Sequence, residues 1–185
     1  MIMRPRVSSF IATSLDGFIA RTDGRLDWLD DAQSLIPEGE DCGYIEFMAS
    51  IDGLVMGRHT FEQVVTFDEW PYGALPVTVL SHVPVTVPSL LARTVRSSQE
   101  SPAGLVAQLG REGFRRLYVD GGHTIQSFLR AGLLDEITIT VIPVLLGAGR
   151  PLFGSLPHDV KLTTMRSRAY EFGFVQSTYR IDDAS

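Results

Sequence analysis

The sequence has few of the features that would connect it with an oxidising compartment, a metal or a membrane. It contains a single cysteine, Cys42, so no disulfide can form within the chain, and its four histidines show no metal-ligand spacing. Its first residues carry positive charge but no apolar signal-peptide segment, and no apolar run approaches the ~18 residues that a membrane helix needs. We therefore expect a cytoplasmic protein without a metal site or a membrane contact.

An excess of positive charge is also absent. The formal net charge is −6 and the isoelectric point is about 5.1. Proteins that bind nucleic acids usually present a basic surface to the phosphate backbone. We therefore expect a small-molecule ligand and no nucleic acid, and any anionic ligand must be held by local positive groups.

The common nucleotide and hydrolase motifs are missing as well. The spaced glycines Gly147 and Gly149 lack the third glycine of the Rossmann fingerprint, and they lead through Arg150 into Pro151 and not into a helix. The chain has no Gly-Lys-Ser/Thr phosphate loop and no Gly-x-Ser-x-Gly nucleophile elbow. A dinucleotide site in this chain would need another architecture.

The sequence does carry the pattern of an α/β fold. Short apolar strands alternate with helices as far as about residue 133, and strands then follow one another. The predicted strands are 7–13, 54–56, 77–80, 117–119, 137–146, 160–170 and 175–181, and the predicted helices are 29–35, 44–48, 59–65, 103–109 and 124–129. We expect a single domain over residues 1–185, with a mixed, mainly parallel sheet that ends in an antiparallel C-terminal hairpin. Residues 84–102 are predicted to be a loop.

A first candidate anion site lies where the strand 54–56 runs into Gly57-Arg58-His59-Thr60. The start of a helix presents unpaired N–H groups and a positive dipole end, and glycine lets a ligand approach the backbone closely. Arg58 and His59 add positive charge there, and Thr60 adds a hydroxyl donor. This set suits the 2′-phosphate of NADP(H) better than the free ribose of NAD(H).

A second junction of the same kind is Gly121-Gly122-His123-Thr124, after the strand 117–119. Paired glycines at the carboxyl end of a strand, opening a helix, are typical of pyrophosphate sites in open α/β sheets. Each junction alone could be a plain tight turn. Two of them in one small chain favour a dinucleotide.

The chain resembles a known family in these and further segments. Residues 55–62 are similar to the cofactor-binding segment of dihydrofolate reductases, and 120–122 lie where those enzymes carry a glycine pair. Residues 14–20, 117–122, 132–136 and 142–147 are similar to the reductase domain of the bacterial riboflavin biosynthesis deaminase-reductase and to its free-standing relatives. The resemblance covers nearly the whole chain and implies a three-layer dihydrofolate-reductase-like fold, an NADPH cofactor and a homodimer.

The resemblance also assigns cofactor residues. Those matching residues that flank the nicotinamide are Ala12 and Ile19. Those matching contacts of the adenosine 2′-phosphate and of the next cofactor strand are Gly57, Arg58, His59, Thr60, Leu80, Ser81 and His82. Those matching the pyrophosphate turn are Gly121, Gly122, His123 and Thr124.

On the substrate side the resemblance implies a carboxylate and a threonine that assist proton transfer. Counting back from the first glycine turn places Asp41 at the carboxylate position, and Thr140 falls at the threonine. Asp120 matches an acidic position near the substrate pocket of the riboflavin branch. Trp28 lies near the loop tryptophan of the family, and Glu46 is an alternative to Asp41. Asp41 could equally favour a helix start through its charge.

The implied activity is NADPH-dependent hydride transfer to a small heterocyclic or carbonyl/imine substrate. An apolar residue near Leu75 replaces the basic residue that holds the folate tail, which disfavours folate. One alternative is the riboflavin-pathway 5-amino-6-(5-phosphoribosylamino)uracil reductase, which needs a further basic group for the substrate phosphate; Arg150 and Lys161 are candidates. Another alternative is a non-catalytic NADP(H)-binding protein.

Overall fold

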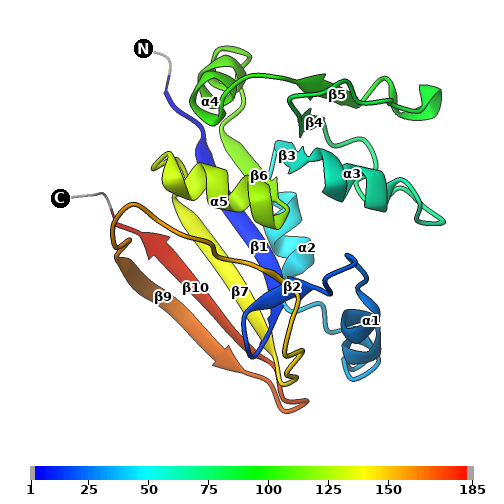
Figure 1. The fold of residues 1–185 in the computed structure, drawn as a ribbon, viewed down its shortest axis with the longest axis vertical. Coiled ribbons are helices and arrows are strands. Elements are labelled where there is room, and N and C mark those ends of the chain that lie inside the picture. Colours follow the sequence, from blue (N-terminus) through cyan, green and yellow to red (C-terminus); the bar gives the residue numbers. More distant parts are fainter. Residues whose placement is uncertain (1–2, 183–185) are drawn as a thin grey trace.

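The computed structural model describes residues 3–182 and is built around an eight-stranded sheet. The strand order is β5-β4-β3-β6-β1-β7-β10-β9. These strands are β1 (Arg6–Ser14), β3 (Gly53–Gly57), β4 (Val77–Leu80), β5 (Val95–Ser98), β6 (Arg116–Asp120), β7 (Glu136–Ile142), β9 (Leu162–Ala169) and β10 (Val175–Ile181). The strands from β5 to β7 run parallel, and β10 is antiparallel to both β7 and β9. The predicted mixed sheet with an antiparallel C-terminal hairpin is confirmed (Figure 1).

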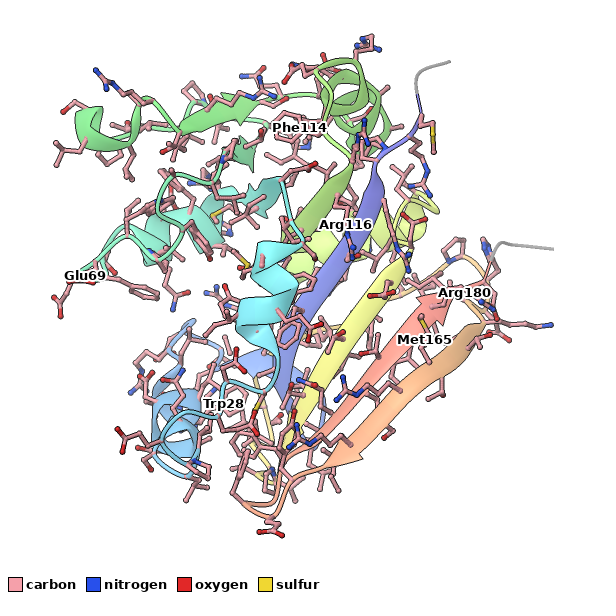
Figure 2. All side chains as sticks on the ribbon, turned by 180° about the vertical axis from the view of Figure 1, so that it is seen from behind. Trp28, Glu69, Phe114, Arg116, Met165 and Arg180 are labelled. Carbon is pink, nitrogen blue, oxygen red and sulfur yellow. The ribbon has the colours of Figure 1, made fainter. Side chains whose placement is uncertain are left out.

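Helices lie on both faces of the parallel part of the sheet. They are α1 (Asp27–Gln33), α2 (Tyr44–Ala49), α3 (Arg58–Val64), α4 (Pro102–Arg111) and α5 (Gly122–Arg130), with a 3-10 turn η1 (Ser89–Leu91). In Figure 1 α5 crosses in front of the sheet, whereas Figure 2, seen from behind, shows α2 (cyan) lying across the opposite face. The result is the three-layer arrangement that the resemblance implied.

Side chains of β3 and β6 point alternately to the two faces of the sheet and so contribute to two separate buried clusters. Val55 pairs with Val119, and both pack beneath α4 and α5 with residues such as Phe128. Leu54 pairs with Tyr118, and both join a second cluster to which α2 and α3 contribute. Because successive side chains of a strand point to opposite faces, a parallel strand buried on both sides reads as a continuous apolar run.

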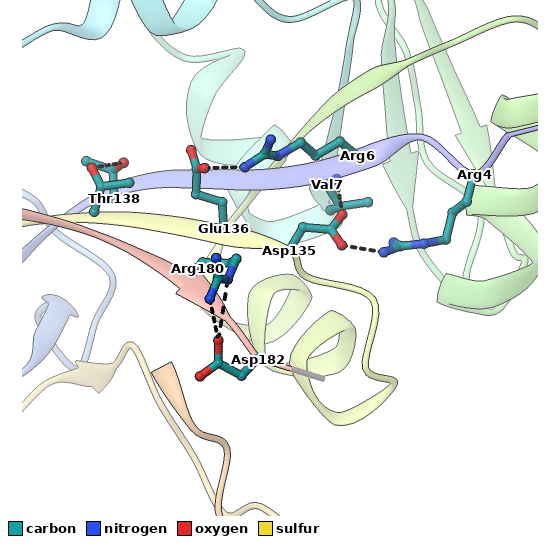
Figure 3. A network of polar contacts seen from close by, with 9 residues as sticks. Arg4, Arg6, Val7, Asp135, Glu136, Thr138, Arg180 and Asp182 are labelled. Carbon is teal, nitrogen blue, oxygen red and sulfur yellow. Dashed lines mark hydrogen bonds and ion pairs between the residues drawn. The ribbon is translucent and has the colours of Figure 1, made fainter. Parts of the chain in front are cut away.

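The N-terminal end of the central strands is fastened by a polar network (Figure 3). Asp135 accepts a hydrogen bond from the backbone N–H of Val7 at 2.7 Å and forms an ion pair with Arg4. Next to it, Arg6 pairs with Glu136 at 2.6 Å. These contacts fix the start of β7 beside β1. They lie at the amino-terminal ends of these strands, opposite to the end where the predicted cofactor residues lie.

The structure contains three short strands that were not predicted. Within residues 84–102 it places β5, whose mostly exposed side chains gave little apolar signal. A two-stranded sheet forms from β2 (Phe18–Ala20) and β8 (Arg150–Pro151), outside the main sheet. Strand β7 ends at Ile142, shorter than predicted, because the following Pro143 has no N–H for the sheet ladder.

Candidate active site

A cavity of about 780 Å³ opens at the carboxyl ends of β3, β4 and β6. Open parallel sheets characteristically bind ligands there, and the volume is that of a cofactor or substrate pocket. All the residues predicted to bind the cofactor line this cavity: Ala12, Ile19, Gly57, Arg58, His59, Thr60, Leu80, Ser81, His82, Gly121, Gly122, His123 and Thr124. Segments far apart in the sequence are therefore brought to one place.

The two glycine turns face each other through their threonines. A Cβ atom added to Gly57 would lie 2.7 Å from Oγ1 of Thr124. In the reciprocal contact, a Cβ atom added to Gly121 would collide with Oγ1 of Thr60. Gly121 also has φ +92°, which a side chain rarely adopts. Both turns therefore require glycine, and together they form one wall of the cavity.

The second turn leaves helix donors free for a ligand. Helix α5 starts after Gly121 without a side-chain capping hydrogen bond and without an acidic residue in its first turn. Its N-terminal N–H groups and dipole therefore favour an anion in the cavity. A Cβ atom added to Gly122 would lie 2.7 Å from Cδ1 of Ile19, so the loop after β1 is packed directly against this turn.

The positive charge at the first turn is held in place by neighbours. Arg58 forms an ion pair with Glu62 at 3.0 Å, one helical turn further along α3. Its other terminal nitrogen lies 3.0 Å from Nε2 of His59. The guanidinium is thus fixed at the rim of the cavity beside a second basic group, an arrangement that suits a phosphate.

Asp120 is the carboxylate of the cavity. It ends β6, and its Oδ1 accepts a hydrogen bond from the N–H of Gly121 at 2.8 Å. Tyr118 of β6 donates its hydroxyl to the backbone oxygen of Phe10 in β1 at 3.0 Å. Burial raises the pKa of Asp120, against the opposing effects of the Gly121 N–H and the Tyr118 hydroxyl. This carboxyl group therefore keeps a proton to a higher pH than an exposed aspartate does.

Tyrosines surround Asp120 as well. Burial together with the charge of Asp120 raises the pKa of Tyr44 to about 12 and also raises that of Tyr72. Tyr72 and Phe10 line the cavity. The part of the cavity around Asp120 is therefore aromatic and apolar. The sequence reasoning missed Phe10 and Tyr72, because each reads there as an ordinary core residue.

The other predicted substrate and catalytic residues are not among those that line the cavity. Asp41 accepts hydrogen bonds from the N–H groups of Gly43 (2.9 Å) and Ile45 (2.6 Å), and these lower its pKa. It therefore occupies the helix-start position that the sequence left open as an alternative. Glu46 is exposed on α2.

Thr140 and Trp28 are buried at the far end of β7 and in α1. Oγ1 of Thr140 accepts a hydrogen bond from Nε2 of Gln176 at 2.9 Å. Trp28 is 4% exposed and packs with Cys42 and Ile142. Both side chains support the loop and hairpin that border the site, and neither faces the cavity.

Arg150 lines the cavity, whereas Lys161 does not.

Among residues 3–182, no three histidine, cysteine, aspartate or glutamate side chains come together as a metal site. Over the same residues, every helix is too short or too polar to cross a membrane.

Comparison with known proteins gives a family match over most of the chain. Residues 5–175 match the family model described as the RibD C-terminal domain. A candidate riboflavin biosynthesis protein from Shewanella sp. PV-4 is 42% identical to this chain, with a TM-score of 0.89 over 96% of this chain and 99% of its own.

Two more distant structures share the fold. A deaminase/5-amino-6-(5-phosphoribosylamino)uracil reductase from Thermotoga maritima is 16% identical, with a TM-score of 0.74, and this chain covers 57% of that longer protein. Dihydrofolate reductase from Enterococcus faecalis, complexed with NADP(H), is 16% identical, with a TM-score of 0.63 over 99% of this chain and 100% of its own. The fold is thus dihydrofolate-reductase-like.

Proposed function

The chain belongs to the RibD C-terminal domain family, and on that premise we propose that it is an NADPH-dependent reductase of a small heterocyclic or carbonyl/imine compound. The observation that carries this proposal is one cavity lined both by every predicted cofactor residue and by the half-buried carboxylate of Asp120. The NADP(H) complex of the dihydrofolate reductase with the same fold supports the choice of cofactor.

The residues present fit a dinucleotide phosphate. Gly57 and Gly121 let the two turns pack closely against Thr124 and Thr60, and the N-terminus of α5 has no side-chain cap. Arg58 and His59 lie together at the rim, where the 2′-phosphate of NADPH would meet them. When bound, NADPH would supply the hydride from its nicotinamide ring.

The protein would orient the nicotinamide and substrate rings and exclude water from them. Ala12 at the carboxyl end of β1 and Ile19 in β2 would flank the nicotinamide, and Phe10 and Tyr72 would enclose the substrate ring next to it. Holding two rings in reacting contact and excluding water lower the barrier without further chemistry by the protein.

Asp120 would hold the proton that follows the hydride. Its raised pKa favours the protonated carboxyl group, and Oδ1 is already oriented by the N–H of Gly121. A carboxyl group of this kind is a suitable general acid for a reduced nitrogen or oxygen atom. We keep Thr140 and Asp41 out of this role because they do not line the cavity.

A second candidate function is the riboflavin-pathway reduction of a ribosylamino-pyrimidine phosphate. The Shewanella protein, described as a candidate riboflavin biosynthesis protein, supports it at 42% identity. This function requires a basic group for the substrate phosphate, and Arg150 is the cavity residue available besides Arg58. A non-catalytic NADP(H)-binding protein is the remaining alternative.

Loss of NADPH absorbance with a panel of pyrimidines, pterins, quinones and imines tests the proposal. Turnover of any member, lost in Asp120→Asn while NADPH binding persists, supports a reductase. Tight NADPH binding without turnover across the whole panel would favour the non-catalytic alternative. A protein that binds no dinucleotide would refute both.

A further inference from the structure

Arg150 lies next to the second glycine turn, although the sequence separates them widely. Strand β8, which contains Arg150, pairs with β2 through Ala20. The backbone oxygen of the next residue, Pro151, lies 3.5 Å from the Cβ position of Gly122. Nε2 of Gln126 in α5 donates to that same oxygen at 3.2 Å. The backbone of Arg150 is therefore fastened to the start of α5.

The guanidinium of Arg150 is held over Gly24. A Cβ atom on Gly24 would lie 3.0–3.1 Å from Cζ and both terminal nitrogens of Arg150, and Gly24 has φ +92°. The backbone oxygen of Gly24 accepts a hydrogen bond from Gln63 of α3 at 3.2 Å. The guanidinium thus lies against the turn at Gly24, and a hydrogen bond links this turn to α3, the helix that follows the first glycine turn.

Arg150 has no acidic partner within residues 3–182, unlike Arg58, which is paired with Glu62. It is exposed at the cavity wall and lies beside the uncapped N-terminus of α5. A planar guanidinium and a row of free N–H groups are complementary to the oxygens of a phosphate. Arg150 and the residues at the start of α5 line the same cavity.

We propose that Arg150 binds the pyrophosphate of NADPH together with the Gly121–Gly122 turn, and that Gly24 keeps its guanidinium in place. This assignment rests on the proposed function. It divides the cationic groups of the cavity: Arg58 and His59 take the 2′-phosphate, and Arg150 takes the pyrophosphate.

The assignment also narrows the substrate class. With Arg150 committed to the cofactor, the cavity residues connected with Asp120 are the aromatic Phe10 and Tyr72. No lysine or arginine side chain among them is left for a substrate phosphate. The compound reduced next to Asp120 is therefore a small non-phosphorylated ring.

Isothermal titration of Arg150→Gln with NADPH, NADH and adenosine 2′-monophosphate tests the assignment. Because both dinucleotides contain the pyrophosphate, we expect both to bind roughly 10- to 100-fold more weakly, the range of lost charge-assisted hydrogen bonds. Adenosine 2′-monophosphate, which lacks the pyrophosphate, should bind as to the wild type. Gly24→Ala should weaken both dinucleotides through the displaced guanidinium.

Arg25→Gln is the matched control, because Arg25 lies in the same loop as Gly24 but is exposed and paired with Asp23. It should bind all three ligands as the wild type does. Unchanged dinucleotide affinities in Arg150→Gln would overturn the assignment, and so would a loss confined to NADPH and adenosine 2′-monophosphate. Arg150→Lys, which keeps the positive charge, replaces the glutamine variant in the titration if that variant does not fold. A wild-type protein that binds neither dinucleotide would overturn the proposed function as well.

Discussion

The Cβ position of Gly57 lies 2.7 Å from Oγ1 of Thr124, so residues 67 positions apart meet at the wall of one cavity. Gly57 itself has an ordinary backbone conformation, with φ −76°. Its need for glycine is therefore a matter of space beside Thr124 and not of backbone strain.

Gly57→Ala should displace Thr124 and weaken NADPH binding by about tenfold, with a small effect on stability, because alanine accepts the backbone conformation. Gly121→Ala should both weaken NADPH binding and lower stability, since the φ of +92° strains any residue with a side chain and the Cβ atom would collide with Thr60. Titration with NADPH and thermal unfolding measure the two effects.

Gly39→Ala provides the control for strain alone. Gly39 has φ +83°, and a Cβ atom there meets no atom within 4 Å. It should lose less stability than Gly121→Ala, because it lacks the collision with Thr60, and it should bind NADPH as the wild type does. Equal cofactor affinities for Gly39→Ala and Gly121→Ala would count against the glycine turn as a cofactor site.

Arg58→Gln should reduce the preference for NADPH over NADH. The 2′-phosphate would lose a charge-assisted hydrogen bond, which corresponds to a roughly 10- to 100-fold weaker NADPH complex. NADH should bind nearly as to the wild type, because it lacks that phosphate. Glu62→Gln, which removes the partner of Arg58 but keeps the guanidinium, is the matched control. An unchanged preference in Arg58→Gln would place the 2′-phosphate elsewhere.

Asp120→Asn should stabilise the ligand-free protein at neutral pH. Because burial raises the pKa of Asp120, the folded state binds its proton more tightly than the unfolded state does. The stability of the wild type should therefore fall as the pH rises from the unfolded pKa, ~3.9, through the raised folded pKa. Asparagine carries no charge and should escape this loss.

Thermal unfolding across pH 4 to 8 measures this effect. We expect a melting temperature for Asp120→Asn that exceeds the wild-type value at the upper end of the range, with the difference shrinking towards the lower end. Asp31→Asn, on the exposed side of α1, should show no such trend. A pH-independent difference would mean that Asp120 is not buried in its charged form.

Asp135→Ala should destabilise the fold and leave the cofactor site intact. Asp135 accepts the N–H of Val7, which is fully buried, and pairs with Arg4. An orphaned buried N–H costs about 1–3 kcal/mol, which should appear as a lower midpoint in urea unfolding. Asp135→Asn, which keeps an acceptor oxygen, should recover part of the loss. NADPH affinity below the melting temperature should match the wild type.

The cavity wall that the two glycine turns form could be predicted from sequence because its signals are local. Gly57-Arg58-His59-Thr60 and Gly121-Gly122-His123-Thr124 each place glycine, cation and hydroxyl within one turn, and the parallel sheet brings the strand ends together. The segment 132–136 also matched the family, yet its Asp135 serves the fold and not the chemistry. A family match alone therefore does not separate structural from reacting residues.

The substrate side could not be predicted as well. The position of Asp41 was obtained by counting across a loop, and the actual contacts of its carboxylate are with the backbone at the start of α2. Phe10 and Tyr72 meet Asp120 only through tertiary packing. The contact of Arg150 with Gly24 depends on β2 and β8, which are too short to show a periodicity. The homodimer and the cytoplasmic location remain predictions.

Equilibrium titration of the wild-type protein with NADPH and NADH, side by side, tests whether the cavity is an NADPH site. We predict that both bind in the cavity and that NADPH binds at least about tenfold more tightly, because only NADPH carries the phosphate that Arg58 and His59 would meet. Equal affinities, or no binding of either dinucleotide, would contradict it.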